Sequence, residues 1–527
     1  MAKSIWSRLT ASITGGAIII ALFSVLSKIA GLLRDRLLAA NFGAGSTLDS
    51  YYAAFKIPDL IFNTLILGAL ASAFIPIFTK LYQNDAKAAW RLANSVLNIL
   101  LIILLSLTIV ALVIAPQLMG FIAPGFSGQQ LIDTILLTRI MLLSIVFFAI
   151  SNVVGGMLNS LRRFATFAAA PIIYNLGIIL GIVLFYPWLG LTGLAWGVVL
   201  GAFGHLAIQF WEARKVGWQW EFSIKISQEV KRVFLLMGPR TVGLAGNQIT
   251  EIIITMLATQ MAAGSLAIYR LADNLQNVPI GLVGVSLAIA VFPVFAETLR
   301  DGNSDRFQDT FSLSVRRIIF FSVPITVFII LLRAQIVRVV LGAGQFDWQA
   351  TYWTAQTLGW FAIGLFAQSL IPTLARVFYA LEDTITPVLI SLINVGLTIY
   401  LAWHLAPVYG VIGLAAAQTT GGITQLILLY IFLKFKLGRL DDRRIIWATI
   451  KITFNALLAG LGVYIVLRIL ANLVDMHTFW GIATQGLVAG LVGVLIYFAS
   501  SLLTNCEEIA LIKNWLGKYW RFLAKRP

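Results

Sequence analysis

Seven ionisable residues stand close together in an apolar stretch near the start of the chain. They are Lys28, Arg34, Asp35, Arg36, Asp49, Lys56 and Asp59. The apolar residues around them form segments long enough to cross a bilayer, where a charged side chain is costly. Ionisable residues at that depth usually face a water-filled cavity and mark the path of a transported substrate. The pattern therefore predicts a transport path in this part of the protein.

Each of these residues also has a purely structural interpretation. Arg34 and Asp35 either line a cavity or form an internal ion pair that fixes helix packing, with a net energy near zero. Asp49 and Lys56 either contact the substrate or cap or close the entry to the second helix. Of the two interpretations we favour substrate binding, and we assign it to Lys28, Arg34, Asp35, Asp49 and Lys56.

The composition predicts that membrane helices carry these residues. The chain has 527 residues, of which 59% are hydrophobic and 11% are charged, and its mean hydropathy is +0.91. A soluble domain carries roughly 25% charged residues. Nearly every window of about 20 residues is apolar enough to span a bilayer. The period-2 alternation of barrel strands is not seen, so the chain is predicted to be an all-α polytopic membrane protein.

Several function classes are excluded by single residue types and missing motifs. The lone Cys506 cannot form an intrachain disulfide, and His205, His404 and His477 are too far apart in sequence for metal-ligand spacing. We therefore expect no metal and no cofactor. The net charge of +16 is assigned to loops on one side of a membrane rather than to nucleic-acid binding. The phosphate-binding motif of an ATP-driven pump is also missing.

The hydropathy pattern predicts fourteen membrane helices. The predicted spans are 12–33, 50–80, 90–115, 131–158, 166–186, 189–211, 234–261, 265–297, 313–341, 351–380, 385–406, 410–434, 445–472 and 478–504. An even number of spans places both termini on the same side of the membrane.

The distribution of Lys and Arg between loops predicts the orientation. Basic residues collect in one set of loops, and the alternate loops contain neither Lys nor Arg. The loops without basic residues lie near 116–130, 186–190, 262–265 and 404–410. Because basic loops stay inside the cell, both termini are predicted to face the cytoplasm. Arg34 and Arg36 are predicted to fall on the outer side after the first helix, where they either serve a function or reach the interface.

Three pairs of similar segments recur at an offset of about 217–221 residues. The pairs are 43–78 with 262–295, 158–180 with 379–401, and 192–217 with 412–438. Each repeat holds six predicted helices, so the repeats are parallel and are related by an axis along the membrane normal. Such an arrangement predicts a central substrate cavity between two lobes and favours alternating access by rocking.

The repeats predict the domain organisation. We expect an N-terminal lobe at 1–217, a C-terminal lobe at 218–440 and two further helices at 441–506. The last segment, 507–527, has apolar residues at helical spacing with basic residues among them. It is predicted to be an interfacial amphipathic helix that lies on the anionic inner leaflet and contacts membrane lipids.

Four motifs carry a resemblance to a known family. They are RDRLLAANFGAGSTLDSYYAAFKIPDL at 34–60, GPRTVGLAGNQI at 238–249, LADNLQNVPIGLVGVSLAIAVFP at 271–293 and FYALEDTITP at 378–387. With two six-helix lobes and two extra helices, the chain resembles the MurJ/MviN lipid II flippases of the multidrug/oligosaccharidyl-lipid/polysaccharide exporter superfamily. The resemblance covers essentially the whole chain.

The resemblance implies a transport function in the bacterial cytoplasmic membrane and no enzymatic one. The substrate would be lipid II, an undecaprenyl-pyrophosphate-linked disaccharide peptide, moved from the inner to the outer leaflet by a protein that we expect to be a monomer. Cavity cations would hold the pyrophosphate through charge-assisted hydrogen bonds. The family's last two helices form a groove for the lipid tail, which corresponds to the helices at 441–506 here.

The family's ionic residues are matched unevenly. The basic residue of the first helix is Lys28, where Arg is usual, and Lys lacks the bidentate guanidinium fork. The Arg34–Asp35 pair, Asp49 and Lys56 match. The chain departs from the family at uncharged positions in helices 2, 7 and 8. These positions are Phe62 or Asn63, Leu67, Ile254 or Thr255, and Asn274.

Two departures have a nearby replacement on the same helical face. Arg270 lies one turn before Asn274, and Glu251 lies three residues before Ile254. We predict that Arg270 supplies the cation of helix 8 and that it binds substrate together with Asp273, unless the two form a salt bridge. Glu251 is predicted to be a cation or coupling site.

Asn394, in the middle of the eleventh predicted helix, has two interpretations. It either binds a coupling cation or forms a hydrogen bond between helices. The energy source is left open between Na⁺ coupling, H⁺ coupling and the membrane potential.

Two alternative functions remain open at this point. The first is a sibling carrier, which is either a flippase for another polyprenyl-linked oligosaccharide or a drug/cation antiporter of the same superfamily. The uncharged residues Phe62, Asn63 and Asn274 favour it. The second is a membrane scaffold that does not transport, against which the retained Arg34 and Asp35 argue.

Overall fold

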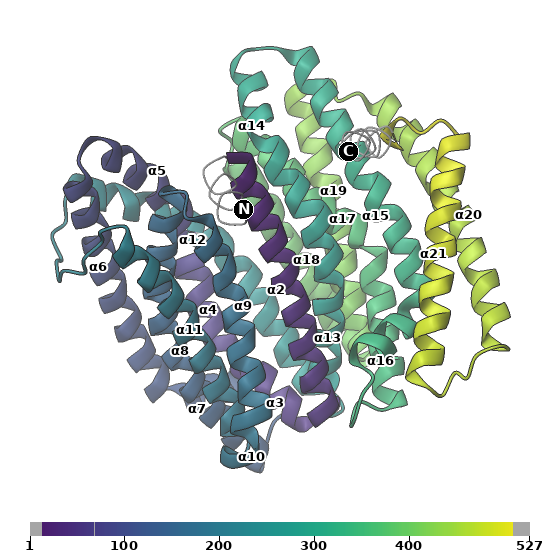
Figure 1. The fold of residues 1–527 in the computed structure, drawn as a ribbon, viewed down its shortest axis with the longest axis horizontal. Coiled ribbons are helices and arrows are strands. Elements are labelled where there is room, and N and C mark those ends of the chain that lie inside the picture. The colour runs from purple at the N-terminus through teal and green to yellow at the C-terminus, as the bar shows by residue number, and fades with distance from the viewer. Residues whose placement is uncertain (1–12, 68, 510–527) are drawn as a thin grey trace, which may run out of the picture. The chain divides into compact units, whose positions relative to one another are not determined.

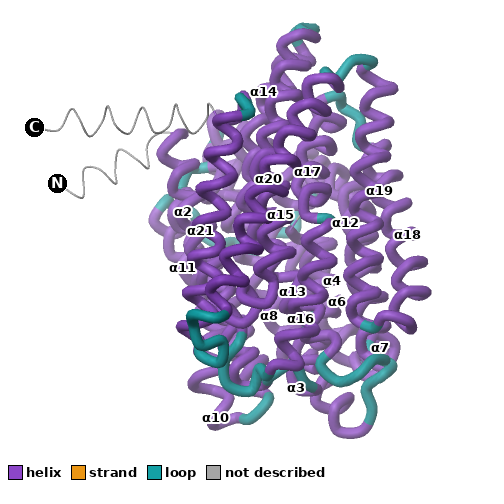
Figure 2. Tube along the Cα trace, turned by 90° about the vertical axis from the view of Figure 1, so that its right-hand side faces the viewer, coloured by secondary structure: helices purple, strands orange, loops and turns teal. Residues whose placement is uncertain are grey.

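The computed structural model describes residues 13–67 and 69–509, and every regular element in these ranges is a helix (Figure 2). Eleven of the fourteen predicted spans correspond to helices with the length and hydropathy of a membrane crossing. Ten of them are α6 (Ala86–Val113), α8 (Gly128–Ser160), α9 with η2 and α10 (Phe164–Leu189), α11 (Thr192–Lys215), α13 with η3 and α14 (Ser265–Arg300), α15 (Ser304–Leu341), α18 (Ile385–Tyr409), α19 (Val411–Leu437), α20 (Asp442–Ala471) and α21 (Phe479–Leu503). The eleventh is the pair α16 (Trp348–Ile363) and α17 (Leu365–Ala380), bent by 43°.

The other three predicted spans are also helical, and they hold most of the candidate site. They are α2 (Ile13–Phe42), α12 (Gln228–Thr259), and a broken run of α3 (Ser46–Ala54), α4 (Lys56–Phe62), η1 (Asn63–Leu67) and α5 (Ala69–Asn84). A short helix, α7 (Ala115–Ile122), follows α6, and a 3₁₀ turn, η4 (Glu507–Ile509), follows α21. The prediction of an all-α polytopic membrane protein is confirmed.

The prediction for the first helix was wrong at its C-terminal end. It was expected to end at residue 33, which placed Arg34 and Arg36 in an outer loop. The helix α2 instead continues to Phe42, because Leu37, Leu38, Ala39 and Ala40 favour helix and the first breaker is Gly43. Arg34 and Arg36 therefore lie inside a helix, and the exception to the loop-charge pattern disappears.

The described chain divides into two compact units. The described residues up to Ala267, together with Ala343–Asp347, form the first, and Ile268–Gly342 with the described residues from Trp348 onward form the second. Figure 1 traces the chain through both. The lobe boundaries inferred from the repeats stay a prediction, and the predicted C-terminal amphipathic helix lies outside the described residues from residue 510 onward.

Glycines bring two helices of the first unit into backbone contact. A Cβ atom on Gly177 would lie 2.2 Å from the Cα atom of Gly201, and one on Gly181 would lie 2.6 Å from the Cα atom of Gly197. The four-residue spacing on both helices is the small-residue pattern by which helices pack closely in a membrane. The seam holds α9 and η2 (Gly181–Phe185) against α11 and so fixes the position of Asn175, one half-turn before Gly177.

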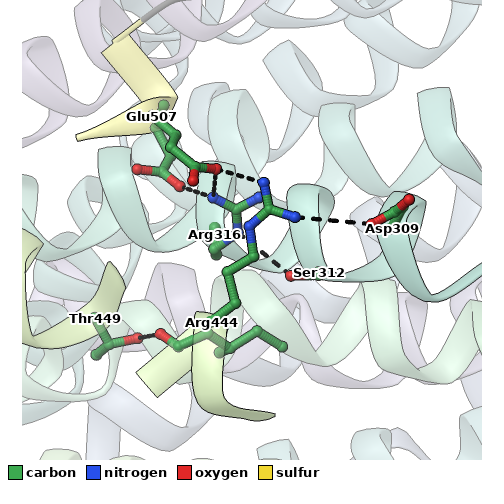
Figure 3. A network of polar contacts seen from close by, with 8 residues as sticks. Asp309, Ser312, Arg316, Arg444, Thr449 and Glu507 are labelled. Carbon is green, nitrogen blue, oxygen red and sulfur yellow. Dashed lines mark hydrogen bonds and ion pairs between the residues drawn. The ribbon is translucent and has the colours of Figure 1, made fainter. Parts of the chain in front are cut away.

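A network of charged residues ties the end of the second unit to its helices (Figure 3). Arg316 of α15 forms ion pairs with Glu507, at 2.9 Å, and with Glu508. Arg444 of α20 pairs with Glu507 at 2.7 Å and with Asp309 at 3.7 Å. The Arg444 guanidinium, with help from Arg316, lowers the pKa of Glu507. Arg316 is buried inside α15, and its charge is compensated by Glu508.

Candidate functional site

Arg34 is held between a neighbouring carboxylate and an amide on another helix. Its Nε and NH2 groups donate to Oδ1 of Asp35 at 2.9 and 2.7 Å, and NH1 donates to Oδ1 of Asn175 at 3.0 Å. The Asn175 amide in turn donates to the carbonyl of Pro171 at 3.0 Å, which points its oxygen at Arg34. The side chain of Arg34 remains 21% exposed, whereas that of Asp35 is 4% exposed. The guanidinium is therefore fixed in place and still accessible.

Asn175 was missed by the sequence analysis, although the repeats contain its signal. The first repeat reads Asn175-Leu-Gly and the second reads Asn394-Val-Gly at the matching position. Both asparagines bond to a neighbouring helix: Asn394 donates to Oε1 of Gln425 on α19 at 2.9 Å and accepts from Thr398 at 3.1 Å. For Asn394 this geometry fits the interpretation as a helix–helix hydrogen bond.

Asp49 binds backbone groups at the start of another helix. Its two carboxylate oxygens accept hydrogen bonds from the N–H groups of Gly264, at 2.6 Å, and Ala267, at 2.8 Å. These N–H groups lie at the N-terminal end of α13, where a negative charge stabilises the helix dipole. Gly264 has φ +91°, and a Cβ atom there would meet the carbonyl oxygen of Ala44 at 2.0 Å. Asp49 thus caps the start of α13, whereas the structural alternative from the sequence placed it at the entry to the second helix.

Lys56 and Glu251 form one ion pair between α4 and α12. The Lys56 Nζ atom lies 3.2 Å from Oε2 of Glu251, and the two side chains are 7% and 27% exposed. The sequence analysis had assigned them separate tasks, substrate binding for Lys56 and cation coupling for Glu251. The structure pairs the two residues, so each charge is compensated by the other.

The candidate residues of the eighth predicted span lie on α13, in the second unit. Arg270, Asp273 and Asn274 are half-buried, and Asn277 is exposed. A spacing of three and four residues places all four on one helical face. Asp273 accepts a hydrogen bond from Gln276 at 2.9 Å. Arg270 therefore shares a face with Asn274, as the predicted replacement requires.

The remaining predicted positions lie on α2 and around the break in the second span. Lys28 is exposed on α2, and Asp59 is half-buried in α4. Phe62 packs on Phe148 with ring centroids 4.9 Å apart, and Asn63 begins the π-helical turn η1. An equivalent π-helical turn, η3 (Ile280–Val285), lies 217 residues later at the matching repeat position. Such turns are frequent at functional sites.

The described residues show no group of three His, Cys, Asp or Glu side chains that could hold a metal ion. Arg34 and Lys56 are cations held in helices by a carboxylate and, for Arg34, also by an amide. Fixed cations of this kind are suited to charge-assisted hydrogen bonds with an anion.

Solved structures define the class of protein. The fold resembles that of a lipid II flippase MurJ in an inward closed conformation, with a TM-score of 0.78, 24% identity, and coverage of 93% of this chain and 100% of that one. It also resembles an inward-facing multidrug resistance MATE family transporter of the MOP superfamily, with a TM-score of 0.65, 14% identity, and coverage of 81% and 99%. The fold is that of an all-helical polytopic membrane protein.

The sequence comparisons identify the family. The profile of the family described as lipid II flippase MurJ matches residues 38–484. A probable lipid II flippase MurJ from Rhizobium tropici is 29% identical over 523 residues, which cover 95% of each chain. The chain belongs to the MurJ family of lipid II flippases, which are transporters and not enzymes.

Proposed function

We propose that this protein moves lipid II from the inner to the outer leaflet of the bacterial cytoplasmic membrane, as a monomer. Family membership supports lipid II as the substrate. The geometry of Arg34 supports the proposal that this residue binds the pyrophosphate of lipid II. A guanidinium fixed by Asp35 and Asn175, yet 21% exposed, is oriented before an anion arrives. Its planar N–H groups match two phosphate oxygens at once.

We propose that Lys28 and Lys56 contribute further positive charge to the pyrophosphate site in the first unit. In the second unit, Arg270 on α13 is proposed as a separate cation for the anionic substrate. Lys56 is neutralised by Glu251 in this conformation. When phosphate arrives, Lys56 exchanges the Glu251 carboxylate for a phosphate oxygen, which couples substrate binding to a change between α4 and α12. Asp49 caps the start of α13. It is proposed to have a structural role and not to contact the substrate.

We propose that both termini lie in the cytoplasm. In the first unit, Lys80 in the last two turns of α5 and Lys87 in the first turn of α6 flank the α5–α6 turn, and the α8–α9 turn carries Arg162 and Arg163. At the opposite ends of these helices, the turn around α7 contains no Lys or Arg. The positive-inside rule then assigns the basic end to the cytoplasm.

The membrane potential is the energy source that the geometry favours. A charge that crosses the field gains about 2.3 kcal/mol per 100 mV, and the proposed site carries fixed cations on which the field would act. Glu251, the candidate coupling carboxylate for Na⁺ or H⁺, is occupied by Lys56. A collapse of the potential at constant Na⁺ and pH should therefore stop transport.

The function is tested by complementation. A bacterium is depleted of its own flippase, this chain is expressed, and lipid II exposed on the outer leaflet is measured. Rescue of growth and of exposed lipid II is expected, and a chain that reaches the membrane without rescue would overturn lipid II as substrate. The uncharged Phe62 and Asn63 favour one second candidate, another polyprenyl-pyrophosphate oligosaccharide. Native mass spectrometry of the co-purified lipid separates the two.

A further inference from the structure

The segment between α11 and α12 is extended, and its side chains alternate in polarity. From Trp218 to Ser227 the sequence reads WQWEFSIKIS, with an apolar residue at every even position up to Ile226. In an extended chain, an alternation of period two places alternate side chains on opposite faces. Residues 218–227, called the strap below, therefore have one apolar face and one polar face.

The backbone of the strap is hydrogen-bonded to asparagines of α6. Asn94 donates to the carbonyl of Gln219 at 3.0 Å, and Asn98 donates to the carbonyls of Glu221 at 2.9 Å and Ser223 at 3.2 Å. All three carbonyls belong to odd-numbered residues, as expected if one edge of an extended chain faces α6. The strap thus has a fixed register along this helix.

Two tryptophans lock that register. The indole N–H of Trp218 donates to Oδ1 of Asn94 at 2.9 Å, and that of Trp220 donates to Oδ1 of Asn98 at 3.1 Å. Each asparagine therefore bonds through both its amide and its oxygen, and both are buried. The strap satisfies these polar groups of α6, so its removal would take away the hydrogen-bond partners of buried amides, which is unfavourable.

The strap lies where α6 changes from charged to apolar. Lys87 and Arg91 precede Asn94 by two turns and one turn, and residues 93–113 contain no charged side chain. Because an α-helix of about 20 apolar residues spans the hydrocarbon core, the level of Asn94 and Asn98 is the boundary between that core and the headgroups. The strap is therefore held at the height of the membrane interface.

Beyond the buried Trp218, the apolar face of the strap is exposed within the first unit. The exposed fractions are 50% for Trp220, 68% for Phe222, 54% for Ile224 and 74% for Ile226. Apolar surface is stabilised in proportion to the area that leaves water. A continuous row of this kind at the interface is stabilised when it enters the acyl region.

Basic residues surround the strap and indicate the kind of lipid. Lys225 on the polar face, and Lys231 and Arg232 at the start of α12, are all exposed. Glu221 and Glu229 are the acidic residues of the same stretch, so 218–232 carries three basic and two acidic side chains. Exposed Lys and Arg beside an inserted apolar row are attracted to anionic headgroups.

We propose that the strap is an anchor at the membrane interface, with anionic phospholipid as its partner. Phe222, Ile224 and Ile226 enter the outer part of the acyl region, and Lys225 contacts headgroups from the polar face. The role goes beyond the transport of lipid II, because it needs neither Arg34 nor a bound substrate. It holds the start of α12, and with it Glu251, at a defined depth.

The anchor is tested by lipid quenching of a single fluorophore. In a Cys506→Ser background, Phe222→Cys or its neighbour Glu221→Cys is labelled with an environment-sensitive dye, and the full chain is placed in phosphatidylcholine vesicles with phosphatidylglycerol. Lipids brominated near the headgroup should quench the dye at position 222 at least twofold more than at position 221. Equal quenching at the two positions would overturn the proposal that the strap inserts into the membrane. Protection of the dye from soluble iodide without quenching by lipid would also overturn it, because that result indicates a protein partner. Ile224→Cys and Lys225→Cys form a second pair if the first does not fold.

The lipid preference is tested with the same labelled protein. Emission from position 222 should shift to shorter wavelength in vesicles with phosphatidylglycerol than in phosphatidylcholine alone. Lys225→Gln with Lys231→Gln and Arg232→Gln should abolish that difference without changing quenching in neutral vesicles. The same emission in both vesicle types would contradict a preference for anionic lipid.

Discussion

Lys56 and Glu251, separated by 195 residues in sequence, form a 3.2 Å ion pair that joins the broken second span to α12. The pair unites a residue predicted to bind substrate with one predicted to couple a cation. Because Lys56 is 7% exposed, neither charge is easily hydrated if the other is removed. The two residues are therefore expected to act as one unit in both stability and transport.

Glu251→Gln should destabilise the protein, and Lys56→Met with Glu251→Gln should restore most of the loss. A broken pair costs between about 1 kcal/mol for exposed residues and about 3–5 kcal/mol for fully buried ones. Thermal unfolding of the purified protein in detergent measures the cycle. The double variant should still fail to flip lipid II, because the phosphate ligand Lys56 is gone. Full transport by the double variant would remove Lys56 from the site.

Asp49→Ala should destabilise the protein while leaving the transport rate per folded molecule unchanged. The substitution leaves the N–H groups of Gly264 and Ala267 without their acceptor, at about 1–3 kcal/mol for a buried donor. Asp49→Asn keeps one acceptor oxygen and should lose less. Transport normalised to folded protein checks this, and a folded Asp49→Ala protein that does not transport would show that Asp49 touches substrate.

Gly177→Ala should destabilise the protein far more than Gly396→Ala, its counterpart in the second repeat. A Cβ atom on Gly177 would lie 2.2 Å from the Gly201 backbone, whereas one on Gly396 meets nothing within 4 Å. Overpacking of this kind costs about 1–3 kcal/mol, or more when backbone must move. The unfolding temperatures of the two variants decide the matter, and equal values would show that the α9–α11 seam can open without loss.

Asp383 should make a stabilising contribution that disappears at low pH. Burial alone would raise its pKa, but hydrogen bonds with Lys436 and Thr386 bring it down from 3.8 to about 2. A lowered folded pKa stabilises the protein above the unfolded value near 3.8, and this contribution is lost as the pH falls towards about 2. Asp383→Asn should therefore unfold at a lower temperature at pH 7, with the gap to the unsubstituted chain narrowing below pH 4. A gap independent of pH would place the effect in packing.

Much of the fold could be predicted from the sequence because membrane helices are recognisable by the length and apolar composition of their segments. All fourteen predicted spans correspond to helical segments. The end of α2 could not be placed, because two charged residues look like a loop when their partners are unknown. In the structure, Asp35 neutralises Arg34 and Asn175 completes its hydrogen bonds, so the charge is tolerated within the helix.

For the candidate site, the sequence points to the ionisable residues but not to Asn175 or to the pairings between residues. The adjacent Arg34–Asp35 pair follows from sequence, whereas Lys56 with Glu251 and Asp49 with Gly264 depend on tertiary contacts more than 190 residues apart. The strap escaped notice for a different reason. An alternation of period two was not expected in a helical chain, and only the asparagines of α6 show what the extended segment binds.

The most direct test of the account compares Arg34→Lys with Arg34→Ala in flippase-depleted cells, with lipid II on the outer leaflet as the readout. The account predicts that Arg34→Ala loses transport at least tenfold, and that Arg34→Lys keeps the charge but recovers only part of it, because Lys cannot donate to Asn175 and two phosphate oxygens in one plane. Both proteins should remain folded in the membrane. Full transport by a folded Arg34→Ala protein would contradict the claim that Arg34 holds the pyrophosphate.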